Sequence, residues 1–346
     1  MKKALIIVIL AIGSFFSLFF FFSKDEKTPE NNSLPALENE TPQFKLEEKK
    51  PSLTKDSIPV MSEKEFQGSD LKLVKVLDQN EFYTRHSITY KSEGFTISGI
   101  MNVPAGKGPF PVLFLNHGFI DPKYYTNGQG LKREQDFFAR NGYVVLHSDY
   151  RNHAQSDFDP ENDVRPRSGY VEDVLNAISA VKNSELTFFD KENIGMLGHS
   201  MGGGITINVM VTKPEIAKAF VLLAPINANY KENFDRWVVP DEEFSGVAEE
   251  FYKQYGSQEE NPEFWKSISA INYLDKITSP IMLHQGALDK DVPVEWSRDL
   301  FQSLKDAGKD ITYYEYPNGP HTFINEQPIV MQRTLEFFNK ILKNKS

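Results

Sequence analysis

The feature that most constrains this chain is a serine set among glycines. The stretch NIGMLGHSMGGG, residues 193–204, holds five glycines around Ser200. Glycine inside a helix costs about 1 kcal/mol relative to alanine, so this density indicates a backbone that approaches its neighbours too closely for side chains. Residues 193–197 are typical of a buried strand and residues 202–211 of an apolar helix. The pattern therefore predicts a sharp turn at Ser200.

Strand-like and helix-like segments alternate through most of the chain. Short apolar runs bounded by turn residues predict strands at 111–118, 143–150, 193–197, 219–225, 280–286 and 311–317. Apolar residues at helical spacing predict helices at 131–142, 171–183, 202–211, 294–308 and 329–342. A hairpin is expected within residues 86–104, where two alternating runs flank Ser-Glu-Gly. Alternating strand and helix units predict an α/β fold with a mostly parallel central sheet and helices on both faces.

One segment, residues 226–278, interrupts this alternation and is too long for a simple connection. It combines many acidic residues with large aromatic side chains. These aromatic residues are Phe234, Trp237, Phe244, Phe251, Tyr252, Tyr255, Phe264 and Trp265. We expect a small helical lid insertion over the strand ends, whose aromatic residues form the core of the lid or, as the alternative, contact a substrate.

The turn at Ser200 has the pattern Gly-x-Ser-x-Gly. Between a strand and a helix this pattern is typical of a nucleophile elbow, which exposes the serine hydroxyl on a strained turn. A side chain at Gly198 or Gly202 is expected to clash with adjacent backbone, and the next two glycines are expected to let the helix pack closely on the sheet. A lone match to the pattern is weak evidence, so the partners of the serine decide the interpretation.

A serine nucleophile needs a base, and the base needs an acid that orients it. His321 follows the last predicted strand within YPNGPHTF and is therefore the candidate base. Two carboxylates, Asp289 and Asp291, follow the preceding strand within HQGALDKDVP. Asp289 lies where the turn leaves the strand and is the preferred acid. Asp291 precedes a helix, and its alternative role is to cap that helix.

The tetrahedral oxyanion of acyl transfer needs a pair of N–H donors. The amide of Met201, directly after the serine, is expected to be one donor. The amide of Phe119, in the NHGF loop after an early strand, is expected to be the other. His117 begins this loop and either simply ends the strand or braces the loop with its ring.

Composition and charge exclude several classes of site. The 346-residue chain has a formal charge of −10, and the deficit falls in residues 61–346 because residues 1–60 are neutral. An acidic domain without a Lys/Arg cluster argues against nucleic-acid binding. The absence of cysteine excludes disulfides, thiolate metal sites and a cysteine nucleophile. No His/Asp cluster has the spacing of metal ligands, so neither a metal nor an organic cofactor is expected.

The N-terminus predicts membrane association. Lys2 and Lys3 precede 19 uncharged, mostly apolar residues, 4–22, a length that matches the roughly 30 Å of hydrocarbon in a bilayer. Residues 1–23 are expected to be an uncleaved signal anchor or, alternatively, a cleaved signal peptide, with the catalytic domain outside the cytoplasm. Residues 24–60, rich in Pro, Glu, Lys and Asn, are predicted to be a disordered tether, so that the folded domain comprises residues 61–346.

Several stretches together resemble the catalytic domain of prolyl oligopeptidase-like serine hydrolases, within the α/β-hydrolase superfamily. They are SITYKSEGFTISGIMNVPAGKGPFPVLFLNHGF, DYRNHAQSD, GHSMGGG and SPIMLHQGALDKDVPVEWSRDLFQSLKDAGKDITYYEYPNGPHTF. The resemblance spans residues 85–340. It implies an α/β-hydrolase fold, a catalytic triad of Ser200, Asp289 and His321, and an oxyanion hole at the amides of Phe119 and Met201.

Two departures from the family pattern bear on the substrate. The large peptidases of this family carry a β-propeller ahead of the hydrolase domain, and here only residues 61–85 of the folded unit precede the hairpin, so no propeller is expected. Many relatives read His-Gly-Gly at the oxyanion loop, where this chain reads His-Gly-Phe. The expected function is hydrolysis of a small ester or peptide amide, as a peptidase or, alternatively, a carboxylesterase. A non-catalytic surface-binding protein is the remote alternative.

Overall fold

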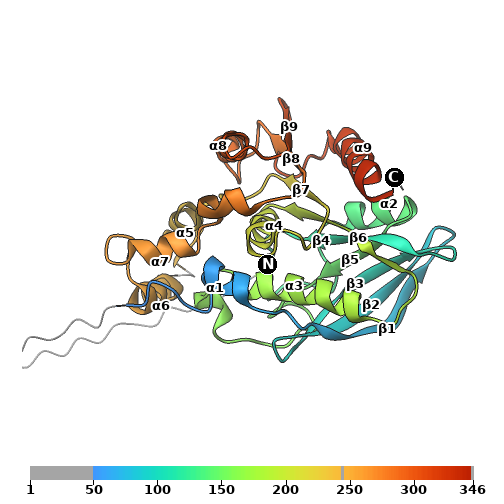
Figure 1. Cartoon of the computed structure of the whole chain (residues 1–346), viewed down its shortest axis with the longest axis horizontal. Coiled ribbons are helices and arrows are strands. Elements are labelled where there is room, and N and C mark those ends of the chain that lie inside the picture. Colours follow the sequence, from blue (N-terminus) through green and yellow to red (C-terminus); the bar gives the residue numbers. More distant parts are fainter. Residues whose placement is uncertain (1–49, 243–244, 344–346) are drawn as a thin grey trace, which may run out of the picture. The chain divides into compact units, whose positions relative to one another are not determined.

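The computed structural model of the chain describes residues 50–242 and 245–343 (Figure 1). The predicted N-terminal anchor and most of the predicted tether lie outside these residues. Within the described part, no helix is both long enough and apolar enough to cross a membrane.

The described residues form one sheet of nine strands in the order β1-β2-β3-β5-β4-β6-β7-β8-β9. The strands are β1 (Ser69–Gln79), β2 (Tyr83–Ser92), β3 (Phe95–Pro104), β4 (Phe110–Asn116), β5 (Val144–Ser148), β6 (Phe189–His199), β7 (Ala219–Leu223), β8 (Ile281–Gly286) and β9 (Ile311–Tyr316). Strands β4 to β9 pair in parallel, whereas β1, β2 and β3 pair antiparallel and join the sheet through β3 and β5. The predicted hairpin (β2–β3) and the mostly parallel sheet are therefore confirmed.

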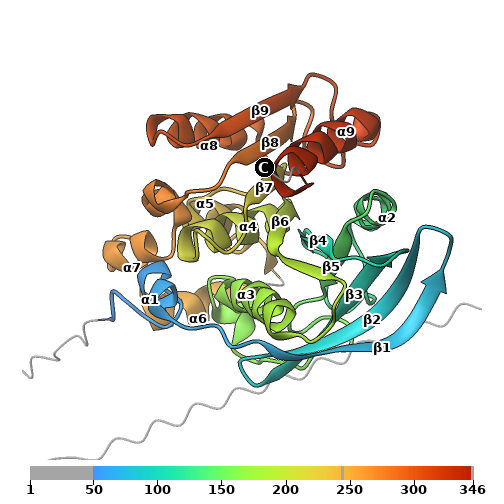
Figure 2. The same ribbon diagram turned by 45° about the vertical axis from the view of Figure 1, so that its right-hand side comes forward.

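Helices cover both faces of the sheet, as Figure 2 shows. On one face pack α3 (Ser168–Asn183), α4 (Met201–Thr212) and α8 (Val294–Asp306), and on the other pack α2 (Lys132–Arg140) and α9 (Gln327–Phe338). Alternate residues of β4 serve the two faces, because Val112 and Phe114 belong to the first core and Leu113 and Leu115 to the second. A continuous apolar run of this kind is typical of a strand buried on both sides.

The insertion between β7 and β8, residues 226–278 and hereafter the lid, is helical. It contains α5 (Tyr230–Trp237), α6 (Ser245–Tyr255), α7 (Pro262–Ser267) and η3 (Ala270–Lys276). Most of its aromatic residues form a separate core, as predicted. The members of this lid core that are almost fully buried are Phe234, Phe251, Tyr255, Phe264 and Trp265. Tyr252 packs against this core, whereas Trp237 lines a cavity. Phe244 lies outside the described residues.

The folded part begins earlier than the predicted boundary at residue 61. Helix α1 (Ile58–Glu63) already spans this position and buries Ile58 and Met61. Before the helix, Asp56 is 3% exposed and accepts a hydrogen bond from Arg165 Nε at 2.7 Å. Assigning residues 50–60 to a disordered tether was therefore wrong. Their polar composition conceals the order, because the stabilising partners are charged groups elsewhere in the chain.

Candidate active site

The register of the parallel strands brings the predicted site residues to one edge of the sheet. Asn116 at the end of β4 lies opposite Gly198 of β6, so the His117–Phe119 loop begins beside the turn at Ser200. On the other side, β8 and β9 end in register at Gly286 and Tyr316. The loops that follow these strands carry Asp289 and His321.

The backbone at Ser200 is strained, as the elbow predicts. Its φ of 55° and ψ of −121° lie outside the conformations that a non-glycine residue readily adopts. Neighbouring backbone holds this conformation. The Ser200 N–H donates to the carbonyl of Leu223 at 2.9 Å, and its carbonyl accepts from the amides of Gly204 and Ile226, each at 3.2 Å.

The glycines around Ser200 are required by close packing. A Cβ atom on Gly198 would overlap the carbonyl oxygen of Gly202, and one on Gly202 would overlap the carbonyl oxygen of Asn116. Both expectations from the sequence are therefore confirmed. The two glycines that follow permit a different contact from the predicted one, because Gly203 and Gly204 approach Pro225 and Ile226, in the segment after β7.

Asp289 and His321 are directly paired. His321 Nδ1 donates to Asp289 Oδ2 at 2.7 Å, with the aspartate side chain fully buried and the imidazole 12% exposed. The other oxygen, Oδ1, accepts the backbone amides of Asp291 and Val292, each at 2.9 Å. Burial raises the pKa of Asp289, but the His321 hydrogen bond and these amides outweigh it and hold the pKa below its usual value. The carboxylate is therefore ionised at neutral pH.

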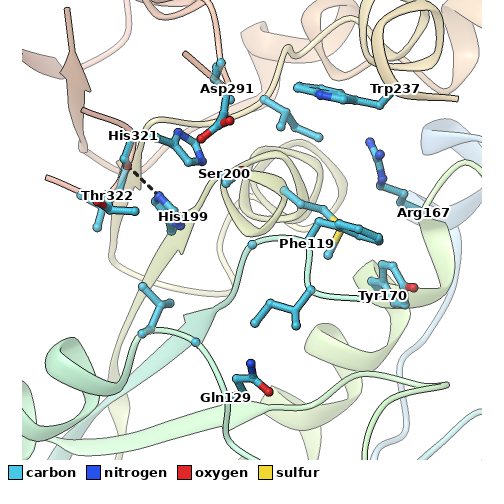
Figure 3. A pocket seen from close by; sticks show the side chains of 18 of the residues that line it. Phe119, Gln129, Arg167, Tyr170, His199, Ser200, Trp237, Asp291, His321 and Thr322 are labelled. Atoms are coloured by element: carbon cyan, nitrogen blue, oxygen red, sulfur yellow. Dashed lines mark hydrogen bonds between the residues drawn. The ribbon is translucent and has the colours of Figure 1, made fainter. Parts of the chain in front are cut away.

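Asp291 does not cap the following helix, because Pro293 occupies the N-cap position of α8. Its side chain lines the cavity beside His321 (Figure 3). Asp289, Asp291 and His321 form, among the described residues, a group whose potential metal-ligand atoms lie within 4.8 Å of one another. Both oxygens of Asp289 are already engaged in the bonds described above, so the pairing with His321 accounts for its position.

His199, the residue before the serine, supports the His321 loop from behind. Its Nε2 donates to the backbone carbonyl of His321 at 3.0 Å, and the two rings lie 4.6 Å apart (Figure 3). Burial, with a smaller contribution from nearby His321, lowers the pKa of His199 to about 4. The ring is therefore neutral at pH 7 and acts as a hydrogen-bond donor rather than as a charge beside the candidate base.

The oxyanion loop is braced by His117. Burial, with a smaller contribution from His153, lowers the pKa of His117 to about 3, so its ring is neutral and Nδ1–H donates to the carbonyl of Gly118 at 2.7 Å. Because a peptide unit is planar, this bond also fixes the direction of the Phe119 N–H. The same loop runs against the serine, since a Cβ on Gly118 would lie 3.1 Å from Ser200 Cβ.

A cavity of about 810 Å³ opens at these strand ends. Ser200, Met201, Phe119 and His321 line it together, which places all the predicted site residues except the buried Asp289 at one surface (Figure 3). The lid contributes further lining residues, among them Tyr230, Trp237 and Val247. The arrangement therefore offers a strained serine, an imidazole oriented by a carboxylate, and two backbone amides at a partly enclosed space.

Comparison with known proteins adds the family. The family model described as "Prolyl oligopeptidase family" matches residues 129–345. The chain belongs to the prolyl oligopeptidase family. Among curated relatives, the uncharacterized peptidase YuxL of Bacillus subtilis is 25% identical over 279 residues, which are 77% of this chain and 39% of that protein. The chain thus spans well under half the length of this relative.

Solved structures share the fold. The acylaminoacyl peptidase of Pyrococcus horikoshii superposes with a TM-score of 0.60 at 23% identity, covering 77% of this chain and 43% of that one. The acetyl xylan esterase of Paenibacillus sp. R4 superposes with a TM-score of 0.61 at 17% identity, covering 83% and 96%. These likenesses confirm the α/β-hydrolase fold that the sequence predicts.

Sequence reasoning missed two groups at this site. It assigned no role to His199, whereas the ring donates a hydrogen bond to the backbone carbonyl of His321. It also made nothing of Arg167, which lines the cavity in Figure 3. The GHSMG pattern offers a faint signal for the first, because a residue next to the nucleophile must lie close to the base. The sequence offers no signal for the second, since a loop arginine is usually solvated.

Proposed function

We propose that this chain is a serine hydrolase that cleaves small ester or peptide amide bonds through an acyl-enzyme intermediate. The observation that carries the proposal is the buried Asp289–His321 pair at the same cavity as the strained Ser200. Membership of the prolyl oligopeptidase family supports it.

In the proposed mechanism Ser200 Oγ attacks the substrate carbonyl carbon while His321 Nε2 takes the hydroxyl proton. Asp289 accepts the Nδ1–H bond and stabilises the imidazolium that forms. The amides of Phe119 and Met201 bind the tetrahedral oxyanion. The carbon–leaving-group bond then breaks and His321 returns the proton to the leaving group. Water, deprotonated by the same imidazole, hydrolyses the acyl-serine and regenerates Ser200.

The experiment that tests this function is substitution of the nucleophile. Ser200→Ala should lower hydrolysis of 4-nitrophenyl acetate by at least about 10³-fold, because no acyl-enzyme can form, while the circular dichroism spectrum stays that of the parent. Ser179→Ala, at a serine of α3 remote from the site, is the matched control. Hydrolysis that survives Ser200→Ala would contradict the proposal.

Peptidase activity is the first candidate within this class, because both the family and the relatives named as peptidases point to it. Carboxylesterase activity is the second, favoured by the acetyl xylan esterase that this chain covers almost completely. Aminoacyl- and peptidyl-naphthylamides tested beside acyl esters separate the two. Turnover of the amides with kcat/KM near that of the esters assigns a peptidase, and ester turnover alone assigns an esterase.

We also propose that residues 1–23 anchor the enzyme in a membrane, with the catalytic domain outside the cytoplasm. The support is the sequence itself, in which Lys2 and Lys3 precede the apolar residues 4–22. Cell fractionation of the full chain with alkaline carbonate extraction tests this. Retention in the membrane pellet, with an intact N-terminus by mass spectrometry, is expected. A soluble exported protein that starts after the apolar run would contradict the anchor.

A further inference from the structure

Three arginines follow β5 closely in sequence, and two of them form buried ion pairs with carboxylates of this chain. Arg151 Nη1 pairs with Asp159 and its Nη2 with Asp173, each at 2.9 Å. Arg165 Nη2 pairs with Asp56 at 2.7 Å and with Glu172 at 3.0 Å. Both guanidinium groups are buried. These arginines show what a buried guanidinium requires in this protein, namely at least two carboxylates.

Arg167 is the third and differs from them. Its half-buried side chain lines the cavity of Ser200, and among residues 50–242 and 245–343 no aspartate or glutamate forms an ion pair with it. The backbone of Arg167 is fixed in the left-handed region with a φ of 58°. Its N–H donates to the carbonyl of Arg165 at 2.7 Å, and its carbonyl accepts from Tyr170 at 3.1 Å. Among the described residues, this cation at the cavity wall therefore has no ion-pair partner.

The surroundings of Arg167 partly shield its guanidinium from water, which strengthens its interaction with a carboxylate. The cavity lining includes aromatic and aliphatic side chains, among them Phe119, Met201, Trp237 and Val247, together with the carboxylates Asp163 and Asp241. Burial raises the pKa of Tyr230 to about 12 even though nearby Arg167 lowers it, so that phenol is neutral and supplies no counter-charge. A guanidinium that is partly shielded from water gains most from a carboxylate, which it binds through two parallel N–H bonds.

The position of Arg167 also indicates which part of a substrate it meets. In acyl transfer the leaving group lies on the side of the imidazole that protonates it. Figure 3 shows Arg167 across Ser200 from His321, whereas Asp291 stands beside His321. An acyl part that points away from His321 therefore extends from Ser200 toward Arg167.

We propose that the cavity is specific for substrates whose acyl part carries a carboxylate, which forms a bidentate ion pair with Arg167. This inference rests on the proposed function and deepens it by naming the substrate class. It also implies that acyl parts with a free amine are poor substrates, because Arg167 repels them. Arg167 is then a specificity-determining residue that binds substrate and takes no part in proton transfer.

The first test compares charged and neutral esters of equal chain length. The monomethyl esters of glutaric, adipic and pimelic acids are paired with the methyl esters of valeric, hexanoic and heptanoic acids, and kcat/KM is measured by pH-stat. At least one half-ester should exceed its neutral partner by about tenfold or more. Arg167→Gln should remove this preference, Arg167→Lys should keep part of it, and the surface variant Arg298→Gln should preserve it.

Two results would overturn the proposal. One is a wild-type enzyme that prefers the neutral ester at every chain length. The other is an equal fall of kcat/KM for both esters in Arg167→Gln, which would indicate a structural role for the side chain.

A binding measurement keeps this test separate from the proposed reaction. Ser200→Ala protein is titrated with glutarate, adipate and pimelate, with valerate, hexanoate and heptanoate as monocarboxylate references, and the tryptophan fluorescence is followed because Trp237 lines the cavity. The anions represent the acyl product. Arg167→Gln in the same background should weaken dicarboxylate binding by about tenfold or more, and Arg298→Gln should not. Equal dicarboxylate affinities of Ser200→Ala with and without Arg167→Gln contradict the role of Arg167. Hydrolysis that survives Ser200→Ala contradicts only the proposed reaction.

Discussion

The two walls of the cavity are built by different means. The elbow wall consists of the strand-end loops that carry Phe119, Ser200 and His321, with Asp289 behind His321. It is backbone packed against backbone, since Gly198 and Gly202 leave no room for even a methyl group. The lid wall has its own aromatic core around Trp265 and Phe251. Polar bonds attach the lid to the segment before β1, such as the 2.8 Å contact between Ser57 Oγ and Ser267 Oγ.

This difference separates chemistry from specificity. The oxyanion loop, the strained serine and the His321 loop follow β4, β6 and β9, which are parallel strands of one sheet, so their relative positions follow from the register of the sheet. The lid contributes lining residues such as Trp237 from an insertion with an independent core. Changes in the elbow wall should therefore abolish function, whereas changes in the lid or its attachment should act on lid stability.

The largest expected effect lies in the elbow wall and separates the two neighbouring carboxylates. Asp289→Asn should lower kcat by about 10³–10⁴-fold, because the imidazole loses the partner that fixes its tautomer. Asp291→Asn is the matched control and should lower kcat far less, since its side chain makes no bond to His321 Nδ1. Steady-state kinetics on one ester measures both. A larger loss in Asp291→Asn would reverse the assignment.

The next comparison sets one glycine in each wall against the other. Gly202→Ala should destabilise the protein by about 3 kcal/mol, because its Cβ would meet the backbone of Asn116 and His117. Gly246→Ala, in lid helix α6, meets nothing within 4 Å and should leave stability unchanged or raise it by up to about 1 kcal/mol. Urea unfolding gives both free energies. Similar values would show that the two walls are packed alike.

A third substitution tests the attachment of the lid. Asp56 accepts hydrogen bonds from Arg165 Nε, from Ser168 Oγ and, at 3.4 Å, from Tyr255 Oη of the lid. Asp56→Ala removes one partner of a buried ion pair and should cost about 2–3 kcal/mol, with Glu172 still paired to Arg165. Hydrogen exchange followed by mass spectrometry should show that, relative to the parent, exchange in Asp56→Ala is accelerated more in residues 230–276 than in the sheet. Uniformly faster exchange would contradict a separable lid.

The smallest expected effect is the loss of folding free energy at low pH. It should arise from histidines outside the lid, because the lid contains none. The seven histidines all lie outside residues 226–278. Burial, with a smaller contribution from Arg333, lowers the pKa of His284 to about 3. The unfolded chain binds this proton near pH 6.5 and the folded chain does not. The stabilisation is therefore complete above pH 6.5 and is lost as the pH falls toward 3.

His284→Gln should isolate this contribution. Between pH 6 and 5, its free energy of unfolding should fall less steeply than that of the parent, by up to about 1.4 kcal/mol per pH unit. His86→Gln, at a half-buried residue of β2, is the control and should change the slope less. Identical slopes for His284→Gln and the parent would show that His284 titrates alike in the folded and unfolded chains.

Much of the elbow wall was predictable because its signals are local. Glycine spacing, strand and helix periods, and the order of the strand-end loops predict where Ser200, Asp289 and His321 lie. The choice between Asp289 and Asp291 was less certain from sequence, because two residues along a turn reverse the direction of a side chain. The structure makes the pairing visible through one bond, from His321 Nδ1 to Asp289.

The lid wall and its attachment were less predictable because their partners are distant in sequence. Asp56 lies in a stretch whose composition favours disorder, yet it is buried against Arg165, more than 100 positions away along the chain. The sequence does not distinguish Arg151, Arg165 and Arg167 from one another, and only the folded chain shows that the first two form buried ion pairs with carboxylates. Charge pairing of this kind has no periodic signature.

The central claim is that Ser200 is a nucleophile activated by His321, and covalent labelling tests it most directly. A fluorophosphonate probe should modify the wild-type protein at a stoichiometry of one, with the adduct located on Ser200 by peptide mass spectrometry. His321→Gln should slow this labelling by about 10³-fold or more, while His86→Gln labels at the parent rate. A probe adduct on another residue, or labelling of Ser200 that is unchanged in His321→Gln, would contradict the account.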